Sequence, residues 1–190
     1  MVALFIKSFF AIFGVMDPVG NVPAYLTLTS HMDRAVARAH ARRAVIRAGV
    51  ILLVFLFLGN FLLDAFHISI ASFRIAGGII LLLLGLQIVF GLELPDKGDK
   101  EEGRDVSVVP LATPLIAGPG TITTTVILSK EYGLLATFVG IVANLALSYL
   151  LFHYAHLVLK LLGKKGTVVF AKVMGLILAA IGVEFIRSAL

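Results

Sequence analysis

The chain has 190 residues, of which 59% are hydrophobic and 14% are charged, and its mean hydropathy is +1.04. This composition is typical of membrane proteins and excludes an ordinary soluble domain. The absence of cysteine excludes disulfides and cysteine-ligated metal sites. The net charge of +5 indicates contact with anionic lipid rather than nucleic acid, because the basic residues flank apolar segments.

Six apolar segments follow one another along the chain. Each is near or above the ~20 residues with which a helix crosses a ~30 Å hydrocarbon core, and none alternates as a barrel strand does. We predict an all-α membrane protein with six transmembrane helices in a single domain. The predicted spans are 2–29, 48–66, 75–92, 106–129, 133–157 and 167–189.

The first predicted span contains its own helix breaker, Asp17-Pro18-Val19-Gly20-Asn21. Pro18 suits the first position of a new helix, where its missing N–H costs nothing, and Asp17 would then be the N-cap. An ionisable side chain within a span is expensive and is by default functional. Asp17 could therefore bind a substrate amine, carry a coupling proton, or only cap the second half of the helix.

Lysine and arginine are concentrated in three of the connections between the spans, 30–47, 93–105 and 158–172. Because positive residues favour the cytoplasmic side, we predict that these loops are cytoplasmic and that both termini lie outside. The location this implies is the inner, or cytoplasmic, membrane of the cell, crossed several times.

The fourth predicted span contains a second breaker, Gly118-Pro119-Gly120. As in the first span, an apolar run is followed by a proline with glycine close by, and then by small and hydroxyl-bearing residues. Two interrupted helices at corresponding positions indicate a binding site near the midplane of the membrane. The hydroxyl residues after the second breaker are Thr121, Thr123 and Thr124.

The two halves of the sequence also match elsewhere. Residues 74–77 align with 172–175 and, when one residue is skipped, 85–87 align with 182–184. Each half has three spans, an odd number, so the second half must enter the membrane from the opposite side. We therefore predict an inverted repeat with helices 1 and 4 broken near the midplane. The parts are repeat 1 (1–92), a polar linker (93–105) and repeat 2 (106–190).

The breaks have the chemistry of a site for a small zwitterion. Helix N-termini facing each other attract an anion such as a carboxylate, and the carbonyls left free before each break can take an ammonium or Na⁺. Hydroxyl and amide side chains add neutral hydrogen bonds. The candidate substrate-binding residues are Asp17, Pro18, Val19, Gly20, Asn21, Gly118, Pro119, Gly120, Thr121, Thr123 and Thr124.

Three further polar residues lie within predicted spans. Glu184 precedes Arg187 by three residues, a spacing that favours a local ion pair, and Gln87 is its counterpart in the repeat. Asn144 shares a helix face with Ser148, which favours hydrogen bonding between helices. No nucleophile–base pair, P-loop, dinucleotide fingerprint or metal-ligand set is present, so we expect no enzymatic activity and no cofactor.

The sequence resembles the MarC family of six-span membrane proteins over almost its whole length. The resemblance rests on residues 17–26, 74–87, 112–123 and 172–185. The family includes SnatA-type transporters of small neutral amino acids such as glycine and alanine, and it implies inverted repeats with an amino acid held at the two breaks. Glu184 stands where the resemblance leads us to expect Gln, a departure that would alter ion coupling. The site implied by position comprises Pro18, Val19, Gly20 and Asn21 with Gly118, Pro119, Gly120 and Thr121.

We therefore expect a secondary-active transporter of small neutral amino acids, driven by a gradient of substrate, H⁺ or Na⁺. Two alternatives remain open: an exporter of another small metabolite, and a membrane scaffold or stress-linked protein that transports nothing. The expected partners are the amino acid and the lipid bilayer, without nucleic acid. A stripe of small residues at 171, 175 and 179 would allow a homo-oligomer.

Overall fold

The computed structural model describes residues 2–29, 32–91 and 116–190, and over these ranges the chain is helical without a β-strand. The helices are α1 (Val2–Met16), α2 (Asn21–Leu28), α3 (Arg34–Ala65), α4 (Ile70–Phe90), α5 (Pro119–Glu131), α6 (Leu134–His153) and α7 (Ala155–Arg187).

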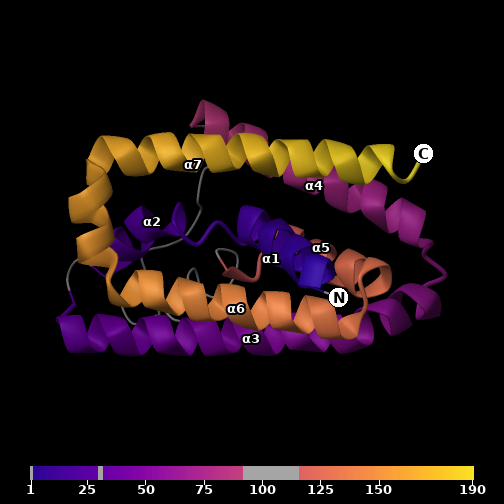
Figure 1. Ribbon diagram of the computed structural model, residues 1–190, viewed down its shortest axis with the longest axis horizontal. Coiled ribbons are helices and arrows are strands. Elements are labelled where there is room, and N and C mark those ends of the chain that lie inside the picture. The colour runs from indigo at the N-terminus through magenta and orange to yellow at the C-terminus, as the bar shows by residue number, and fades with distance from the viewer. Residues whose placement is uncertain (1, 30–31, 92–115) are drawn as a thin grey trace.

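Two pairs of long helices form opposite sides of a frame, and the short helices lie between them (Figure 1). In one pair α3 runs antiparallel to α6, and in the other α4 runs antiparallel to α7. Buried apolar side chains such as Ile12, Leu52 and Ile141 join the first pair to α1. A second cluster, which includes Leu81 and Leu178, joins the second pair to α5. The short helices are therefore held on both sides by apolar packing.

Glycines bring α4 and α7 into close contact. A Cβ atom added to Gly78 would lie 2.5 Å from the carbonyl oxygen of Gly182, and one added to Gly85 would lie 2.5 Å from that of Gly175. Such approach of two backbones is possible only without side chains, and it is a common means of packing helices in membranes. The small-residue stripe of the last span is thus used inside the chain, against α4.

Four helices in the described ranges are long and apolar enough to cross a membrane: Arg34–Ala65, Ile70–Phe90, Leu134–His153 and Lys165–Arg187. They correspond to the second, third, fifth and sixth predicted spans. The first predicted span is divided into α1, with 15 residues, and α2, with 8. For the fourth, the structure describes only the part from 116 onward, which contains the 13-residue helix α5. Four spanning helices are therefore confirmed within the described ranges, and the six transmembrane helices, two of them broken, stay a prediction.

Two predicted loops are mainly helical. Region 30–47 belongs to α3 from Arg34 onward, because its alanine and arginine residues favour helix as strongly as the apolar residues after them. Region 158–172 belongs to α7, which turns sharply at Gly163, where φ is 68°. Glycine adopts this left-handed conformation without the steric cost of a side chain. The third predicted loop, 93–105, lies outside the described residues.

Candidate functional site

The first chain break is a turn closed by a carboxylate. α1 ends at Met16, and Asp17 adopts a left-handed conformation with φ of 41°, which Asp tolerates better than most residues. Its side-chain oxygen Oδ1 accepts a hydrogen bond of 3.0 Å from the backbone N–H of Gly20. α2 then begins at Asn21. Asp17 therefore caps the second half-helix, one of the three roles that its position in the sequence left open.

Two other residues of this turn have structural roles. The side-chain amide of Asn21 donates a 2.9 Å hydrogen bond to the carbonyl oxygen of Met16, so it joins the half-helices across the break. A Cβ atom at Gly20 would collide with the Asp17 carboxylate. The glycine thus makes room for the cap.

The second break begins α5 at a proline. Gly118 is the N-cap, with φ of −75° and ψ of 170°, and Pro119 occupies the start of the helix, where its missing N–H costs nothing. The N–H of Ile122 donates to the carbonyl oxygen of Gly118 over 3.0 Å. Helix geometry leaves the preceding N–H groups, those of Gly120 and Thr121, without an acceptor in their own helix. They point out of the positive end of the helix dipole.

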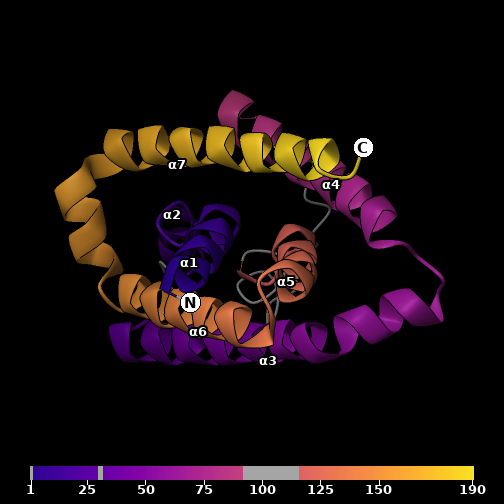
Figure 2. The same cartoon turned by 45° about the vertical axis from the view of Figure 1, so that its right-hand side comes forward.

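The two breaks line one cavity of about 220 Å³. α1 with α2 and α5 lie on opposite sides of the space inside the frame, and α4 and α7 pass along it (Figure 2). Apolar side chains of α4 and α7 complete the walls, among them Leu84, Ile88, Met174 and Leu178. The predicted residues that line the cavity are Asp17, Asn21, Gly118, Pro119, Gly120 and Thr121.

The remaining predicted residues near the breaks do not line this cavity. Pro18, Val19 and Gly20 form the turn behind Asp17. The side chain of Thr123 packs so closely on Gly77 of α4 that a Cβ there would overlap it. Thr124 is fully buried, and its hydroxyl has no hydrogen-bond partner among the residues that the structure describes.

Asn144 and Ser148 fasten α1 to α6 just before the first break. The side-chain amide of Asn144 donates to the carbonyl oxygens of Phe9 (3.0 Å) and Gly140 (2.9 Å). The hydroxyl of Ser148 lies 3.4 Å from the sulfur of Met16, the last residue of α1. The predicted hydrogen bonding between helices is confirmed. Asn144 supports the site by holding α1 in place and does not line the cavity.

The other two supporting residues lie away from the cavity. Arg187 donates hydrogen bonds of 2.7 and 2.9 Å to Glu184, which confirms the predicted local ion pair; both side chains are exposed. Gln87 is half-buried on α4, and its backbone carbonyl accepts a bond from the N–H of Gly91 at the helix end. No group of three or more His, Cys, Asp or Glu residues able to hold a metal occurs within the described ranges.

Comparison with known proteins identifies the family to which this chain belongs. A family model described as "MarC family integral membrane protein" matches residues 2–190. The chain belongs to the MarC family. It is therefore a multi-pass integral membrane protein, in agreement with its apolar helices and with the resemblance noted in its sequence.

Relatives occur in bacteria and archaea, and several are named as UPF0056 membrane proteins. YvbG of Bacillus subtilis is 37% identical over 201 residues, which cover 100% of this chain and 95% of YvbG. YhcE of Escherichia coli is 35% identical over 197 residues, covering 98% and 92%. The protein MJ1677 of Methanocaldococcus jannaschii is 37% identical over 195 residues, covering 98% and 95%. No solved structure matches the chain significantly.

The apolar walls of this MarC-family cavity were missed by reasoning from sequence. Leu84 and Ile88 are indistinguishable from the lipid-facing residues beside them, because both environments favour the same side chains. Gly85 faces Gly175 on α7, and this contact fixes which side of α4 turns inward.

Proposed function

We propose that this MarC-family protein is a secondary-active transporter of small neutral amino acids, such as glycine or alanine. The observation that carries the proposal is that two helix breaks far apart in sequence line one cavity. Irregular backbone at membrane depth is tolerated where it is buried in protein or lines a cavity, and in transporters it holds the substrate.

Both charges of an amino acid would find a counterpart in this cavity. The N–H groups of Gly120 and Thr121 at the start of α5 suit a carboxylate, by the same electrostatics that place anions at helix N-termini. The carboxylate of Asp17, on the opposite wall, suits an ammonium. The hydroxyl of Thr121 and the amide of Asn21 add uncharged hydrogen-bonding groups.

The size and walls of the cavity favour a small substrate without a charged side chain. Its volume of about 220 Å³ is below the roughly 300–1,000 Å³ of pockets for drug-sized ligands. Leu84, Met174 and Leu178 offer no partner to a charged side chain, whose burial without one would be costly. Glycine and alanine meet both conditions.

The inverted repeat belongs to this proposal, and the packing of α4 on α7 supports it. Gly78 faces Gly182, and Gly85 faces Gly175. Exchanging Gly78, which follows the aligned Gly77, with Gly175, and Gly85 with Gly182, maps one contact onto the other, as a two-fold axis between the repeats would. Exchanging the two repeats in the same way also relates α5 to α2. α5 packs on α3 and α4, and α2 packs on the corresponding helices α6 and α7.

Alternating access would follow from movement of the repeats around the breaks, driven by a gradient of substrate, H⁺ or Na⁺. We place both termini outside the cell and the basic end of the molecule in the cytoplasm, with the protein in the inner, or cytoplasmic, membrane of the cell. This arrangement needs no bound cofactor and no enzymatic step.

Uptake of radiolabelled glycine and alanine into proteoliposomes tests the proposal, with H⁺ or Na⁺ gradients imposed. We expect saturable, gradient-driven uptake that Thr121→Val reduces by roughly tenfold, the value of one lost hydrogen bond to a charged group. Thr125→Val is the matched control, because Thr125 lies on the same helix and its buried hydroxyl lacks a partner among the described residues.

Absence of uptake from folded wild-type protein under every gradient would exclude the amino-acid substrate. Equal loss in the two threonine variants would show that α5 is sensitive to substitution in general, and that the cavity is not the site.

A further inference from the structure

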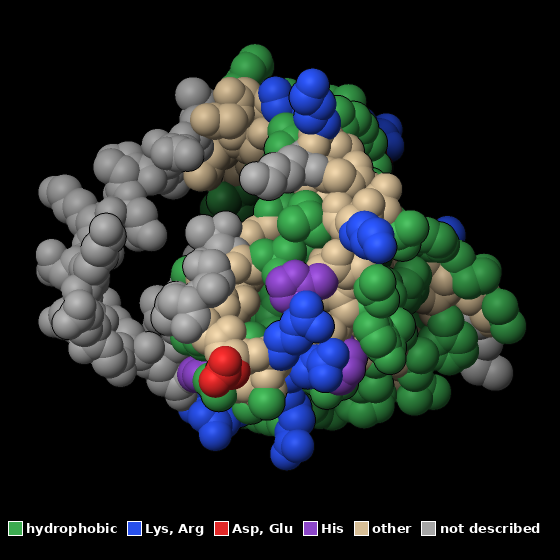
Figure 3. Space-filling view, turned by 90° about the vertical axis from the view of Figure 1, so that its left-hand side faces the viewer, with side chains coloured by type: hydrophobic (Ala, Val, Ile, Leu, Met, Phe, Trp, Pro, Cys, Tyr) green, Lys and Arg blue, Asp and Glu red, His purple; other side chains and the backbone are tan. Residues whose placement is uncertain are grey.

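A second and larger cavity, of about 570 Å³, opens at one end of the molecule where α2, α3, α6 and α7 meet. It has no lining residue in common with the cavity between the breaks. Lys, Arg and His side chains gather around it on this face (Figure 3). We call this cavity the basic vestibule; its basic lining residues are Arg34, Arg38, His153, His156 and Lys160.

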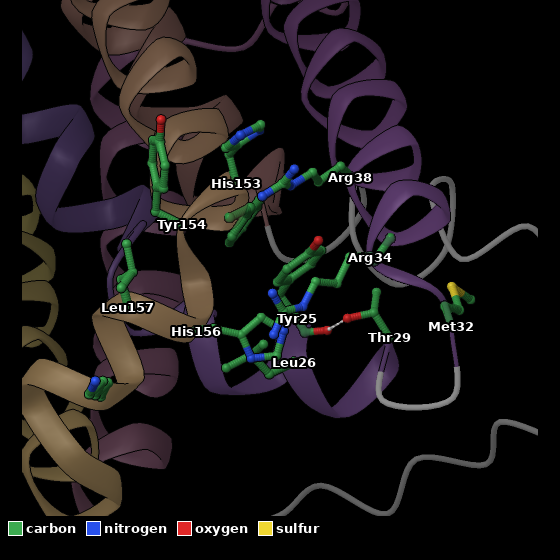
Figure 4. Close-up of a pocket in the computed structure, with 13 residues that line it drawn as sticks. Tyr25, Leu26, Thr29, Met32, Arg34, Arg38, His153, Tyr154, His156 and Leu157 are labelled. Carbon is green, nitrogen blue, oxygen red and sulfur yellow. Dashed lines mark hydrogen bonds between the residues drawn. The ribbon is translucent and has the colours of Figure 1, made fainter.

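The basic side chains converge from opposite walls of the vestibule. Arg34 and Arg38 lie one turn apart on α3 and reach across the hollow toward His156 and His153, respectively (Figure 4). Lys160 of α7 also belongs to the lining, and among the residues that the structure describes no Asp or Glu lines the cavity. Arg34, Arg38 and Lys160 are cations gathered around one hollow, so they repel one another, and a bound anion would offset this repulsion.

Aromatic side chains close the bottom of the vestibule. The rings of Tyr25 and Phe152 are stacked with their centroids 4.9 Å apart, and both side chains are buried. The hydroxyl of Thr29 donates to the backbone carbonyl of Tyr25 over 2.8 Å, so its proton is already used. The vestibule therefore combines a cationic rim with an apolar floor.

A cytoplasmic excess of positive charge accounts for basic residues near the ends of spans, but not for their convergence on a hollow. Guanidinium groups present fixed pairs of N–H donors that match the oxygens of a phosphate. The vestibule also lies at the ends of α3 and α6. The ends of spanning helices are where a membrane protein meets lipid headgroups. We propose that the basic vestibule binds a phosphate group, carried either by an anionic phospholipid or by a free phosphorylated solute.

The first arm of the test uses lipid. Purified protein in neutral detergent is mixed with phosphatidylglycerol or phosphatidylcholine, and bound lipid is counted by native mass spectrometry. If the phosphate is a lipid's, phosphatidylglycerol is retained in preference to phosphatidylcholine. The double variant Arg34→Gln/Arg38→Gln then lowers this retention by tenfold or more, since each lost charge-assisted bond costs about a factor of ten.

The second arm uses inorganic phosphate without added lipid. The thermal unfolding midpoint is measured as phosphate replaces chloride at constant ionic strength. If the phosphate is a free solute's, phosphate raises the midpoint of the wild type but not of Arg34→Gln/Arg38→Gln. The matched control in both arms is Arg42→Gln/Arg43→Gln, which removes the same charge from exposed positions of the same helix outside the vestibule.

If only Arg34→Gln/Arg38→Gln loses binding, the site is supported. The arm in which binding is lost then shows whether the phosphate belongs to a lipid or to a free solute. Equal loss in both pairs, or binding in neither arm, overturns the proposal, because the charges then act only through the general potential. Arg34 and Arg38 are both exposed, so we expect the vestibule variant to fold. Circular dichroism and size-exclusion chromatography check this. Lys160→Gln provides a second test if the double variant does not fold.

Discussion

In the structure, Asp17 caps the turn before α2. In the proposed transport, its negative charge has a second role, which is to bind the ammonium of the substrate. Asn is as good an N-cap as Asp, so Asp17→Asn retains the bond to the N–H of Gly20 while it removes the charge. We expect the unfolding midpoint to stay close to that of the wild type and glycine uptake to fall at least tenfold, the value of one charged contact. Circular dichroism on heating and proteoliposome uptake measure the two effects.

Unchanged uptake in folded Asp17→Asn would leave capping as the only role of this carboxylate. A drop in stability and uptake together would instead show that the side chain matters to the fold of the break, and would not support binding of an ammonium.

Gly20 gives a prediction about stability at the same turn. Because a Cβ would overlap the Asp17 carboxylate, Gly20→Ala should displace the cap and cost about 1 kcal/mol of unfolding free energy. Gly166→Ala is the control: its Cβ would meet only the Cβ of Leu162, at an ordinary 3.5 Å, within a helix where Ala is favoured over Gly. Thermal unfolding in detergent should separate the two, and equal stabilities would contradict the proposed crowding.

At the scale of the helices, the positions of the breaks could be predicted from sequence because proline and glycine act locally. Pro119 begins α5 and Asp17 caps the turn before α2, as their residue types indicated. Helix lengths were harder to predict. The start of α3 at Arg34 was missed because hydropathy reports where a segment meets lipid, and not where its backbone ceases to be helical.

The contact between α4 and α7 is sensitive to a single methyl group. Gly85→Ala would place Cβ 2.5 Å from the carbonyl oxygen of Gly175 and 2.6 Å from the backbone nitrogen of Ala179, and backbone cannot move aside cheaply. We expect this substitution to lower the free energy of unfolding by about 1–3 kcal/mol, the usual cost of overpacking.

Gly49→Ala is the control for this contact, because its Cβ would meet only the end of the Leu145 side chain, at 3.1 Å. That side chain can rotate away, so a small change is expected. Denaturation in mixed micelles compares the two variants. A milder effect at Gly85 than at Gly49 would mean that the helix pair is not as closely packed as described.

At the scale of the whole molecule, the predicted orientation can be tested without preparing a cysteine-free background, because the chain has no cysteine. Leu190 is 95% exposed at the C-terminus, and Lys160 is exposed beside the basic vestibule. In intact cells, a maleimide that does not cross membranes should label Leu190→Cys and spare Lys160→Cys. Lysed cells, in which both should react, provide the control, and the reverse pattern would invert the orientation.

From the sequence, only the internal repeat indicates that the two breaks lie close together in space. Nothing local in residues 15–26 points to residues 116–128. The walls of the cavity could not be expected even so. Ile88 and Met174 belong to apolar runs in which every face of the helix has a similar composition, so the inward face is chosen by packing partners and not by polarity.

The turn of α7 at Gly163 has a mechanical consequence. This corner joins the α3–α6 pair to the α4–α7 pair at one end of the frame, and the connection at 66–69 joins them at the other. Both corners contain a residue with positive φ: 68° at Gly163 and 55° at His67. The pairs thus resemble two stiff rods linked by a pivot at each end. Sliding or rocking of one rod against the other would rotate the backbone at these two joints.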